Sequence, residues 1–474
     1  MDRQLDHSDV DWVFVGTVLS SEVDRSLSIL VDQVLVVNKQ GYIVHLESSE
    51  TLDSLEYLRL AQQSGFPHER LMRLGPDAWI LPGFVDTHIH APQYVNAGMA
   101  LDKPLMEWLE AYTFKAEARI DRDPDGYGKR VYGRLVERMI ENGTTAASVF
   151  GTISVEANLV LARTFLNAGL RGQIGKVAMD QNSPATYIET TEQSLAETRR
   201  FIELTRQLVE TSKPRHLQTV EPVITPRFVP TCTNKLLSGL KMLADETRVR
   251  VQSHLAESRG EVELCKHLLG GQTDVELFHE LGLLGPKALM AHCTHANDTD
   301  LALFAQTGTA IAHCPLSNVY FSSERQLALR EAWNAQVKVG LGSDISGGYR
   351  VGLDENMRWS VGISRLRQGT RQEDDQEPEE RESLAISWKE SMYLATLGGA
   401  QALGLDETNR VGQLKVGQAF DAQLIRVRTK GSRVDWFERE DGSEITIEEK
   451  VEKWWCNGSE VDRKAVWVQG QKIM

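Results

Sequence analysis

Hydrophobic residues in the first part of the chain follow the pattern of short strands. The runs WVFVGTVLS, SILVDQVLVVN and GYIVHLE, between residues 12 and 47, are rich in valine, isoleucine and aromatic residues, and turn residues separate them. This pattern predicts a small β domain. Pro82 and Gly83 predict a turn just before VDTHIH, and we expect the β domain to end there.

The pattern then changes to strands that alternate with amphipathic helices. Between residues 128 and 142 the apolar residues recur at helical spacing, as Val131, Tyr132, Leu135, Val136, Met139 and Ile140. Asn142 and Gly143 are typical of a helix C-terminus. The apolar run TTAASVF follows and predicts a buried strand.

Eight strand-like runs occur in this central part of the chain. They are VDTHIH, TTAASVF, RGQIGKVAMD, LQTVEPVITPRF, VRVQSHLAE, ALMAHCTH, TAIAHCPLSN and VKVGLGSD. Helical sequence lies between them, so the pattern predicts an α/β fold, a (β/α)8 TIM barrel. A doubly wound sheet is the alternative, but no glycine-rich dinucleotide motif follows the first strand.

Strand-like runs return after about residue 410, as VGQLKVGQAFDAQLIRV and KAVWVQGQKIM, and we expect them to complete the N-terminal β domain. The predicted division is 1–80 and 406–474 for the β domain and 81–405 for the barrel. The polar run QGTRQEDDQEPEERES, which starts at Gln368, predicts a solvated loop.

Composition narrows the class of partner. The formal net charge is −15, from 52 basic and 67 acidic residues, which argues against nucleic acid because phosphate binding favours a basic surface. A small neutral substrate is compatible with this charge. The five cysteines are scattered and form no CxxC pair, which favours a reducing cytosol over a disulfide framework. No apolar run is long enough to predict a signal peptide or a membrane span.

Polar residues able to bind a metal stand at the ends of the predicted barrel strands, where barrel enzymes have their active sites. His88 and His90 are two residues apart on the first strand, so both side chains point to the same face. Neutral imidazole is a favoured zinc ligand. On its own, the pair is equally compatible with two hydrogen-bonded core histidines.

Later strand ends supply three more residues of the same kind: His254 in VQSHLAES, His292 in LMAHCTH and Asp344 in GLGSD. Three histidines and one carboxylate would hold zinc and leave a position open for water, with the fourth histidine free for catalysis. Each residue alone is more often a core side chain. Their combination, each at its strand end, predicts a metal-dependent hydrolase.

Other titratable residues near these strands have less certain roles. Glu257 lies three residues after His254, where a carboxylate can move a proton between water and a leaving group. His313 is interpreted as structural or as a neighbour of the ligands. Lys176 lies in the middle of the third strand and the fourth has no lysine, which favours one metal ion over two. His45 and Glu47 match half of another zinc-deaminase motif, but no PCxxC follows.

The motifs PGFVDTHIHAPQ, TPRFVPTC, SHLAES, MAHCTH, AHCPLSN and GLGSDISGG resemble those of the amidohydrolase superfamily, over nearly the whole stretch from about residue 80 to 425. VGQLKVGQAFDAQLI is similar to the strands that close the β-sandwich of that superfamily. Gln93, WLEAYTF and TPRF resemble more narrowly the branch that deaminates guanine to xanthine.

This resemblance implies a role for each matching residue. It implies that one Zn²⁺ per chain is held by His88, His90, His254 and Asp344; that Glu257 shuttles the proton and His292 orients the attacking water; that Asp344 takes part in catalysis; and that Gln93, Arg227, Phe228 and His292 contact a guanine substrate. An arginine and an amide suit the carbonyl and ring nitrogens of guanine, and Phe228 suits its flat face. The resemblance also implies a cytoplasmic homodimer active in purine breakdown.

Two other functions remain open from the sequence. One is a different hydrolase on the same scaffold, such as another aminohydrolase or a triazine chlorohydrolase. The other is a non-catalytic scaffold protein that keeps the fold without the metal. The presence of all four candidate ligands and of Glu257 argues against this second alternative.

Overall fold

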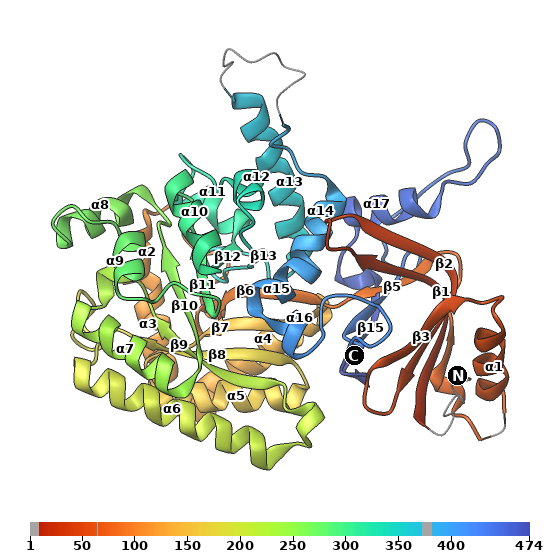
Figure 1. Ribbon diagram of the computed structural model, residues 1–474, viewed down its shortest axis with the longest axis horizontal. Coiled ribbons are helices and arrows are strands. Elements are labelled where there is room, and N and C mark those ends of the chain that lie inside the picture. The colour runs from red at the N-terminus through yellow and green to blue at the C-terminus, as the bar shows by residue number, and fades with distance from the viewer. Residues whose placement is uncertain (1–8, 64, 372–381) are drawn as a thin grey trace.

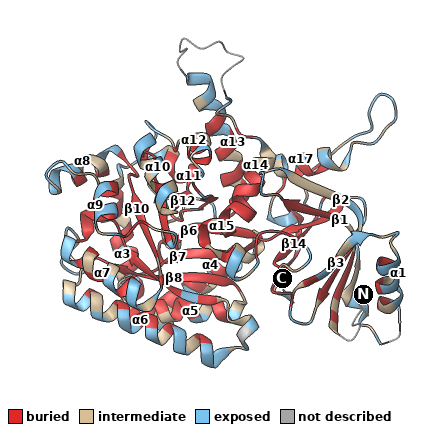
Figure 2. Ribbon diagram, in the orientation of Figure 1, coloured by how far each residue is buried: buried red, intermediate tan, exposed pale blue. Residues whose placement is uncertain are grey.

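The computed structural model describes residues 9–63, 65–371 and 382–474, which form a barrel surrounded by helices and a smaller β domain beside it (Figure 1). The barrel lies on the left in this view and the β domain on the right, with the described ends of the chain close to the β domain. Buried residues follow the barrel strands and the inner side of the second sheet (Figure 2).

Eight parallel strands form the barrel, and each pairs with its neighbours in chain order. They are β6 (Phe84–His90), β7 (Thr144–Phe150), β8 (Arg171–Ala178), β9 (Val220–Pro226), β10 (Arg250–Leu255), β11 (Ala288–His292), β12 (Ala310–His313) and β13 (Val339–Leu341). All eight correspond to the strands that the sequence predicts, so the (β/α)8 barrel is confirmed.

Helices connect and cover these strands. They are α2 (Leu105–Trp108), α3 (Phe114–Arg122), α4 (Lys129–Glu141), α5 (Val155–Ala168), α6 (Thr191–Ser212), α7 (Asn234–Thr247), α8 (Arg259–Leu268), α9 (Asp274–Glu280), α10 (Asp298–Thr307), α11 (Pro315–Phe321), α12 (Leu329–Asn334), α13 (Leu353–Thr370), α14 (Trp388–Tyr393), α15 (Gly399–Leu403) and α16 (Leu405–Thr408). Helix α4 shows why they form: its apolar stripe is buried, and the chain leaves the helix at Gly143 with φ of 80°.

The barrel closes between β6 and the segment that follows β13. The Asp344 amide donates to the His88 carbonyl at 2.8 Å, and the His90 amide donates to the Ile345 carbonyl at 3.0 Å. The buried Asp86 carboxylate accepts from the Ser343 amide at 2.9 Å and from the Ser343 hydroxyl at 2.5 Å. The first and last units of the barrel are therefore joined through peptide groups of the predicted metal-binding residues.

Strands from both parts of the chain share the second sheet, as the sequence predicts. Its order is β16-β15-β14-β5-β1-β2-β3, with β4 paired to β1. The bounds are β1 (Val10–Ser21), β2 (Leu27–Asn38), β3 (Ile43–Ser48), β4 (Leu71–Arg73), β5 (Ala78–Pro82), β14 (Ala422–Arg426), β15 (Arg463–Val468) and β16 (Gln471–Lys472), with helices α1 (Leu52–Ala61) and α17 (Ile447–Asn457) nearby. The domain limits near residues 80 and 405 stay a prediction.

Aromatic side chains from the two ends of the chain pack together inside this domain. Phe14 lies with its ring centroid 5.3 Å from that of Trp467 at an interplanar angle of 86°, and 5.0 Å from that of Phe420. Trp12 contacts Trp467 in a similar edge-to-face arrangement at 5.6 Å. The N-terminal strands thus depend on the C-terminal segment for much of their core.

The turn that Pro82 and Gly83 predict is absent, because the chain continues from β5 across Gly83 into β6. A Cβ atom at Gly83 would lie 2.1 Å from the Thr145 hydroxyl oxygen. The glycine is therefore needed for the close approach of β7 rather than for a change of direction. The residues AWILP, which form β5, were not predicted as a strand.

A buried ion pair joins the barrel to the β domain. Arg171, at the start of β8, donates to Asp421 from Nε at 2.6 Å and from Nη2 at 3.0 Å. The same Nη2 donates to Gln469 at 2.6 Å, and the Gln469 amide donates to Asp421 at 2.8 Å. Both charged side chains are at most 4% exposed. This network leaves neither charge without a partner in the interior.

Two further sequence-based expectations concern the segment at residue 368 and the membrane. Helix α13 extends through Thr370, so the first residues of the polar segment are helical, and residues 372–381 lie outside the described residues. Among the described residues, none of the helices has the length and apolar character needed to cross a membrane.

Replacing Arg171 by alanine tests the joint between the two parts. It would leave Asp421 buried without its cation, so we expect the free energy of unfolding to fall by about 3–5 kcal/mol. Chemical denaturation of both proteins measures this. Arg199→Ala is the matched control, because its bidentate pair with Glu246 is exposed and should contribute little. Equal stability of the Arg171 variant and wild type would contradict the expectation.

Candidate active site

The five residues predicted at strand ends meet at the carboxyl end of the barrel. His88 and His90 lie on β6, His254 lies near the end of β10, and His292 is the last residue of β11. Asp344 follows β13 by three residues and has φ of 46°. Strand register brings His254 and His292 to the same level, because His254 pairs with Ala291 on the adjacent strand.

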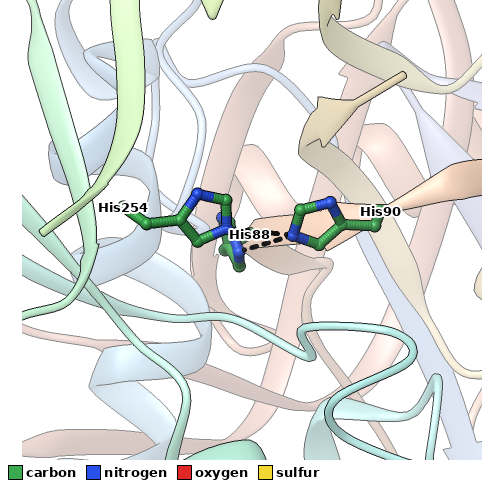
Figure 3. Close-up of side chains that lie close together, drawn as sticks. All are labelled: His88, His90 and His254. Atoms are coloured by element: carbon green, nitrogen blue, oxygen red, sulfur yellow. Dashed lines mark hydrogen bonds between the residues drawn. The ribbon is translucent and has the colours of Figure 1, made fainter. Parts of the chain in front are cut away.

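Three imidazole nitrogens converge in this cluster. His90 Nε2 lies 3.2 Å from His88 Nε2 and 3.1 Å from His254 Nε2. Figure 3 shows the rings of His90 and His254 approaching from opposite sides, with His88 between and below them. All three side chains are buried. Such nitrogens face one another only when a proton or a shared cation lies between them.

Two carboxylates and His292 complete the cluster. Asp344 Oδ1 lies 3.2 Å from His88 Nε2 and 3.4 Å from His90 Nε2. His292 Nε2 lies 3.6 Å from Glu257 Oε1 and 3.9 Å from Asp344 Oδ2. Each of these groups therefore faces the same small volume.

Hydrogen bonds at the rear of two rings determine which nitrogen faces the site. His254 Nδ1 lies 2.6 Å from the Arg227 carbonyl, so it carries the proton and donates, which leaves a lone pair on Nε2. His292 Nδ1 lies 2.9 Å from Asn318 Oδ1, and the same argument gives its Nε2 a lone pair. Both rings are thus oriented as metal-binding histidines are.

Burial favours the neutral form of every titratable group in the cluster. It lowers the pKa of His88, His90 and His254 well below the ordinary value, and the neighbouring histidines lower it further. Burial also raises the pKa of Glu257 well above its ordinary value, with a further contribution from Asp344. A neutral His90 has at most one hydrogen on Nε2, which cannot serve both of the nitrogens that face it, so the arrangement fits a cation.

Two overlapping sets of residues can hold a metal ion here. His88, His90 and His254 form one set, and His88, His292 and Asp344 form the other, with ligand atoms within 4.8 Å of one another in each. Nitrogen and oxygen donors of this kind suit a divalent transition metal. The structure thus brings together all the residues that the sequence predicts as ligands, and His292 with them.

A pocket opens next to this cluster. It is lined by His90, Gln93, Leu105, Trp108, Leu109, Arg227, Phe228, His254, Glu257, His292, Phe321, Asp344 and Gly347. The four residues predicted to contact the substrate, Gln93, Arg227, Phe228 and His292, are therefore in its wall. Phe228 lies with its ring centroid 6.4 Å from that of His254, and both Gln93 and Arg227 are buried.

Glu117 on α3 is a buried residue beside this site that the sequence analysis missed. It accepts hydrogen bonds from Gln93, from both terminal nitrogens of Arg227 and from Tyr187. Its side chain has no exposed surface. No local signal identifies it, since a glutamate in FKAEARI is typical of a solvated helix face.

The backbone around Glu257 is held by two more buried carboxylates. Glu261 accepts from the Glu257 amide at 2.7 Å, and Asp274 accepts from the Ala256 amide at 2.7 Å. Thr294 donates to the Glu257 carbonyl at 2.6 Å. These contacts restrict the turn that carries Glu257. The sequence alone offered no sign of them, because both acids stand on separate helices.

Three residues with other possible roles lie outside the cluster. His313 is buried, and burial lowers its pKa to about 3. His295 pairs with the exposed Glu324 at 3.3 Å. Lys176 pairs with Glu189 at 2.8 Å and belongs to neither metal-binding set.

The chain matches known proteins over almost its full length. The model of the amidohydrolase family matches residues 79–472. The guanine deaminase of Dictyostelium discoideum is 35% identical and covers 97% of this chain and 98% of its own length. The guanine deaminase of Mus musculus is 36% identical, with coverage of 98% and 96%.

Solved structures agree with this likeness. A guanine deaminase from C. acetobutylicum with guanine bound in its active site has a TM-score of 0.83 and 30% identity, and it covers 98% of this chain and 100% of its own. A triazine hydrolase has a TM-score of 0.76 at 18% identity, with coverage of 97% and 94%, which supports the fold alone.

Removal of one candidate ligand tests the metal site. We expect His254→Ala to lower the metal content of purified protein several-fold, because one of the converging nitrogens is lost. Elemental analysis of wild type and variant measures this. His313→Ala is the matched control, since it removes a buried histidine outside both metal-binding sets and should keep the metal. Equal metal content in the His254 variant and wild type would argue against its role as a ligand.

Proposed function

The chain belongs to the amidohydrolase family and, within it, to the guanine deaminases, and from this membership we propose how its residues carry out the reaction. The reaction is the hydrolysis of guanine, in which water replaces the C2 amine to give xanthine and ammonia. The observation that most strongly supports this function is the cluster of His88, His90, His254 and Asp344 beside the pocket lined by Gln93 and Arg227.

We propose that these four residues hold one Zn²⁺ per chain. The buried, neutral imidazoles support this assignment, because zinc accepts nitrogen and carboxylate donors and keeps an open position in catalytic sites. Zinc in such a site acts as a Lewis acid and lowers the pKa of water towards about 7. The remaining steps depend on the side chains of the chain itself.

Glu257 is the proposed proton carrier. Its raised pKa suits a carboxyl group that takes a proton from water and later releases it. In the proposed sequence, Glu257 removes a proton from the water that attacks C2 and delivers it to the departing amine. The C–N bond then breaks and ammonia leaves. The hydrogen bonds that Glu261 and Asp274 accept from the adjacent backbone amides support a defined position for this side chain.

His292 and Asp344 are proposed to orient the attacking water. The proton on His292 Nδ1 faces Asn318, so Nε2 is left to accept a hydrogen bond from water. Asp344 Oδ2 lies 3.9 Å from the same nitrogen, which supports a shared role. Its carboxylate also accepts the second proton of the water, and this proton passes to N3 of the ring, so that xanthine and ammonia leave and both carboxylates are regenerated.

Gln93, Arg227 and Phe228 are the proposed contacts of the purine. Arg227 and Gln93 supply N–H groups for the oxygen and ring nitrogens of guanine. Phe228 supplies an aromatic face at the pocket wall. Arg227 also carries a positive charge next to the ring, which stabilises the negative charge that develops as water adds.

The proposal makes two claims that can be tested separately: that the protein is a metal-dependent hydrolase, and that its substrate is guanine. A panel of guanine, adenine, cytosine and a chlorotriazine, run with metal quantification on the same preparation, distinguishes them. We expect ammonia from guanine alone. Release of chloride from the triazine would favour the alternative hydrolase, and native protein without metal would favour the non-catalytic scaffold.

A homodimer in the cytoplasm is proposed from the likeness to the guanine deaminases. The five cysteines are free, and four of them are buried, which supports a reducing compartment. A role in purine breakdown follows from the proposed reaction, because the product has lost the amine of guanine.

Glu257→Gln tests the proton carrier. The amide has nearly the same shape but cannot accept and release the proton, so we expect kcat to fall by about 10²–10⁴-fold while the metal content stays the same. Ammonia release and elemental analysis measure the two quantities. Glu263→Gln, an exposed glutamate on α8, is the control. Substantial turnover by the Glu257 variant would exclude this role.

A further inference from the structure

We infer that Glu117, a residue behind the pocket wall, determines which purines the site accepts, by directing N–H groups of Gln93 and Arg227 towards the ligand. The inference rests on the proposed contact of these two residues with the purine. It adds a residue that has no exposed surface and does not line the pocket. Glu117 is a positioning residue, since it acts through its neighbours.

The carboxylate of Glu117 is saturated with donors. Gln93 Nε2 lies 3.1 Å from Oε1, Arg227 Nη2 lies 3.1 Å from Oε1, and Arg227 Nη1 lies 2.8 Å from Oε2. The Tyr187 hydroxyl donates to Oε2 at 2.9 Å. A carboxylate offers about four lone-pair positions, so every one of them is used. The buried charge therefore requires all these partners at once.

This pairing sets the orientation of Gln93. Its amide nitrogen faces the carboxylate, because the amide oxygen would be repelled there. Its oxygen faces the Ser346 amide at 3.5 Å. The hydrogen that remains on Nε2 is therefore the one left for a ligand. Without Glu117, the amide is free to turn over and present its oxygen instead.

The same pairing sets the orientation of Arg227. The fork of its guanidinium is engaged by Glu117, and the group lies 5.1 Å from the ring centroid of Phe114. Nη1 also donates to Met179 Sδ at 3.9 Å. A guanidinium has five N–H groups and no acceptor, so those taken by neither Glu117 nor Met179 remain as donors. Both side chains thus offer donors to the pocket.

Because Gln93 and Arg227 both present N–H groups to the pocket, the ligand edge that faces them should carry hydrogen-bond acceptors. Oxygen and bare ring nitrogen, as in a 6-oxopurine, satisfy the donors. An amino group in place of the oxygen leaves buried N–H groups without partners, which costs much more than the loss of an ordinary contact. Glu117 therefore favours an oxo group over an amino group at this edge.

Guanine and 2,6-diaminopurine provide the test, because both carry the reactive C2 amine and differ in the oxygen or amine at C6. In Glu117→Gln, we expect kcat/KM for guanine to fall by about 10²–10³-fold. The kcat/KM for 2,6-diaminopurine should fall much less, so that the ratio of kcat/KM for guanine to kcat/KM for 2,6-diaminopurine decreases by at least about tenfold. Metal content should match wild type. An unchanged ratio would overturn the inference and leave Glu117 with a purely structural role.

Glu189→Gln is the matched control. Glu189 is a largely buried carboxylate in the same region, and its ion-pair partner is Lys176 at 2.8 Å, not Gln93 or Arg227. We expect this variant to change both kcat/KM values by the same factor and to keep the ratio of wild type. A ratio that narrows equally in the control would also overturn the inference, because loss of any buried charge would then explain it.

A second variant covers the case in which Glu117→Gln does not fold. Glu117→Asp keeps the charge but shortens the side chain, so it cannot engage Gln93 and Arg227 together. We expect its ratio of kcat/KM for guanine to kcat/KM for 2,6-diaminopurine to be lower than that of wild type, but higher than that of a protein in which Glu117 contacts neither residue. A wild-type ratio in a folded Glu117→Asp protein would count against the inference. Wild-type protein inactive on guanine would instead refute the proposed function.

Discussion

The site depends on the closure of the barrel between β6 and the segment after β13. Asp86 is fully buried, and its carboxylate accepts hydrogen bonds from the backbone amides of Ser343 and His88. Burial raises the pKa of Asp86 to about 7, and the hydrogen bonds from Ser343 and His88 oppose that rise. Because His88 and Asp344 also share a peptide hydrogen bond, the geometry of the ligands follows from the contact that completes the fold.

Burial then controls the electrostatics of the site. It acts in opposite directions on acids and bases, lowering the pKa of His254 and raising that of Glu257, so both tend towards their neutral forms. A cluster of lone pairs without protons is unfavourable by itself, and a divalent cation relieves it. The pocket next to the cluster differs from it, because the buried groups behind its wall, Glu117 and Arg227, form an ion pair and not a set of neutral side chains.

The ligands could be predicted from the sequence because two visible signals coincide in them. Each is a polar residue that can bind metal, and each ends a strand that is otherwise apolar, as His292 does in ALMAH. Period-two alternation was enough to place His88 and His90 together. The eight strands and the sheet shared by both ends of the chain were predictable for the same reason, since buried strands in a barrel have continuous apolar runs.

The features of the fold and the site that were not predicted depend on contacts between segments far apart in the sequence. No local sequence pattern indicates such contacts. Glu117 lies on a helix whose sequence does not distinguish it from a solvated acid, and only the fold brings it to Arg227, 110 residues away. Gly83 looked like a turn residue, but its role depends on Thr145 in the next strand. The long connection between β6 and β7, which brings Leu105, Trp108 and Leu109 to the pocket, was likewise not predictable from periodicity.

The shared sheet also has a consequence for the synthesis of the protein on the ribosome. Strands β1 to β3 are made well before Phe420 and Trp467, which cover Phe14. At 5–20 residues per second, the roughly 400 residues between them take about 20–80 s to synthesise. The nascent chain therefore carries an uncovered aromatic face until these later residues are made, and exposed apolar surface of this kind promotes aggregation of incompletely folded chains.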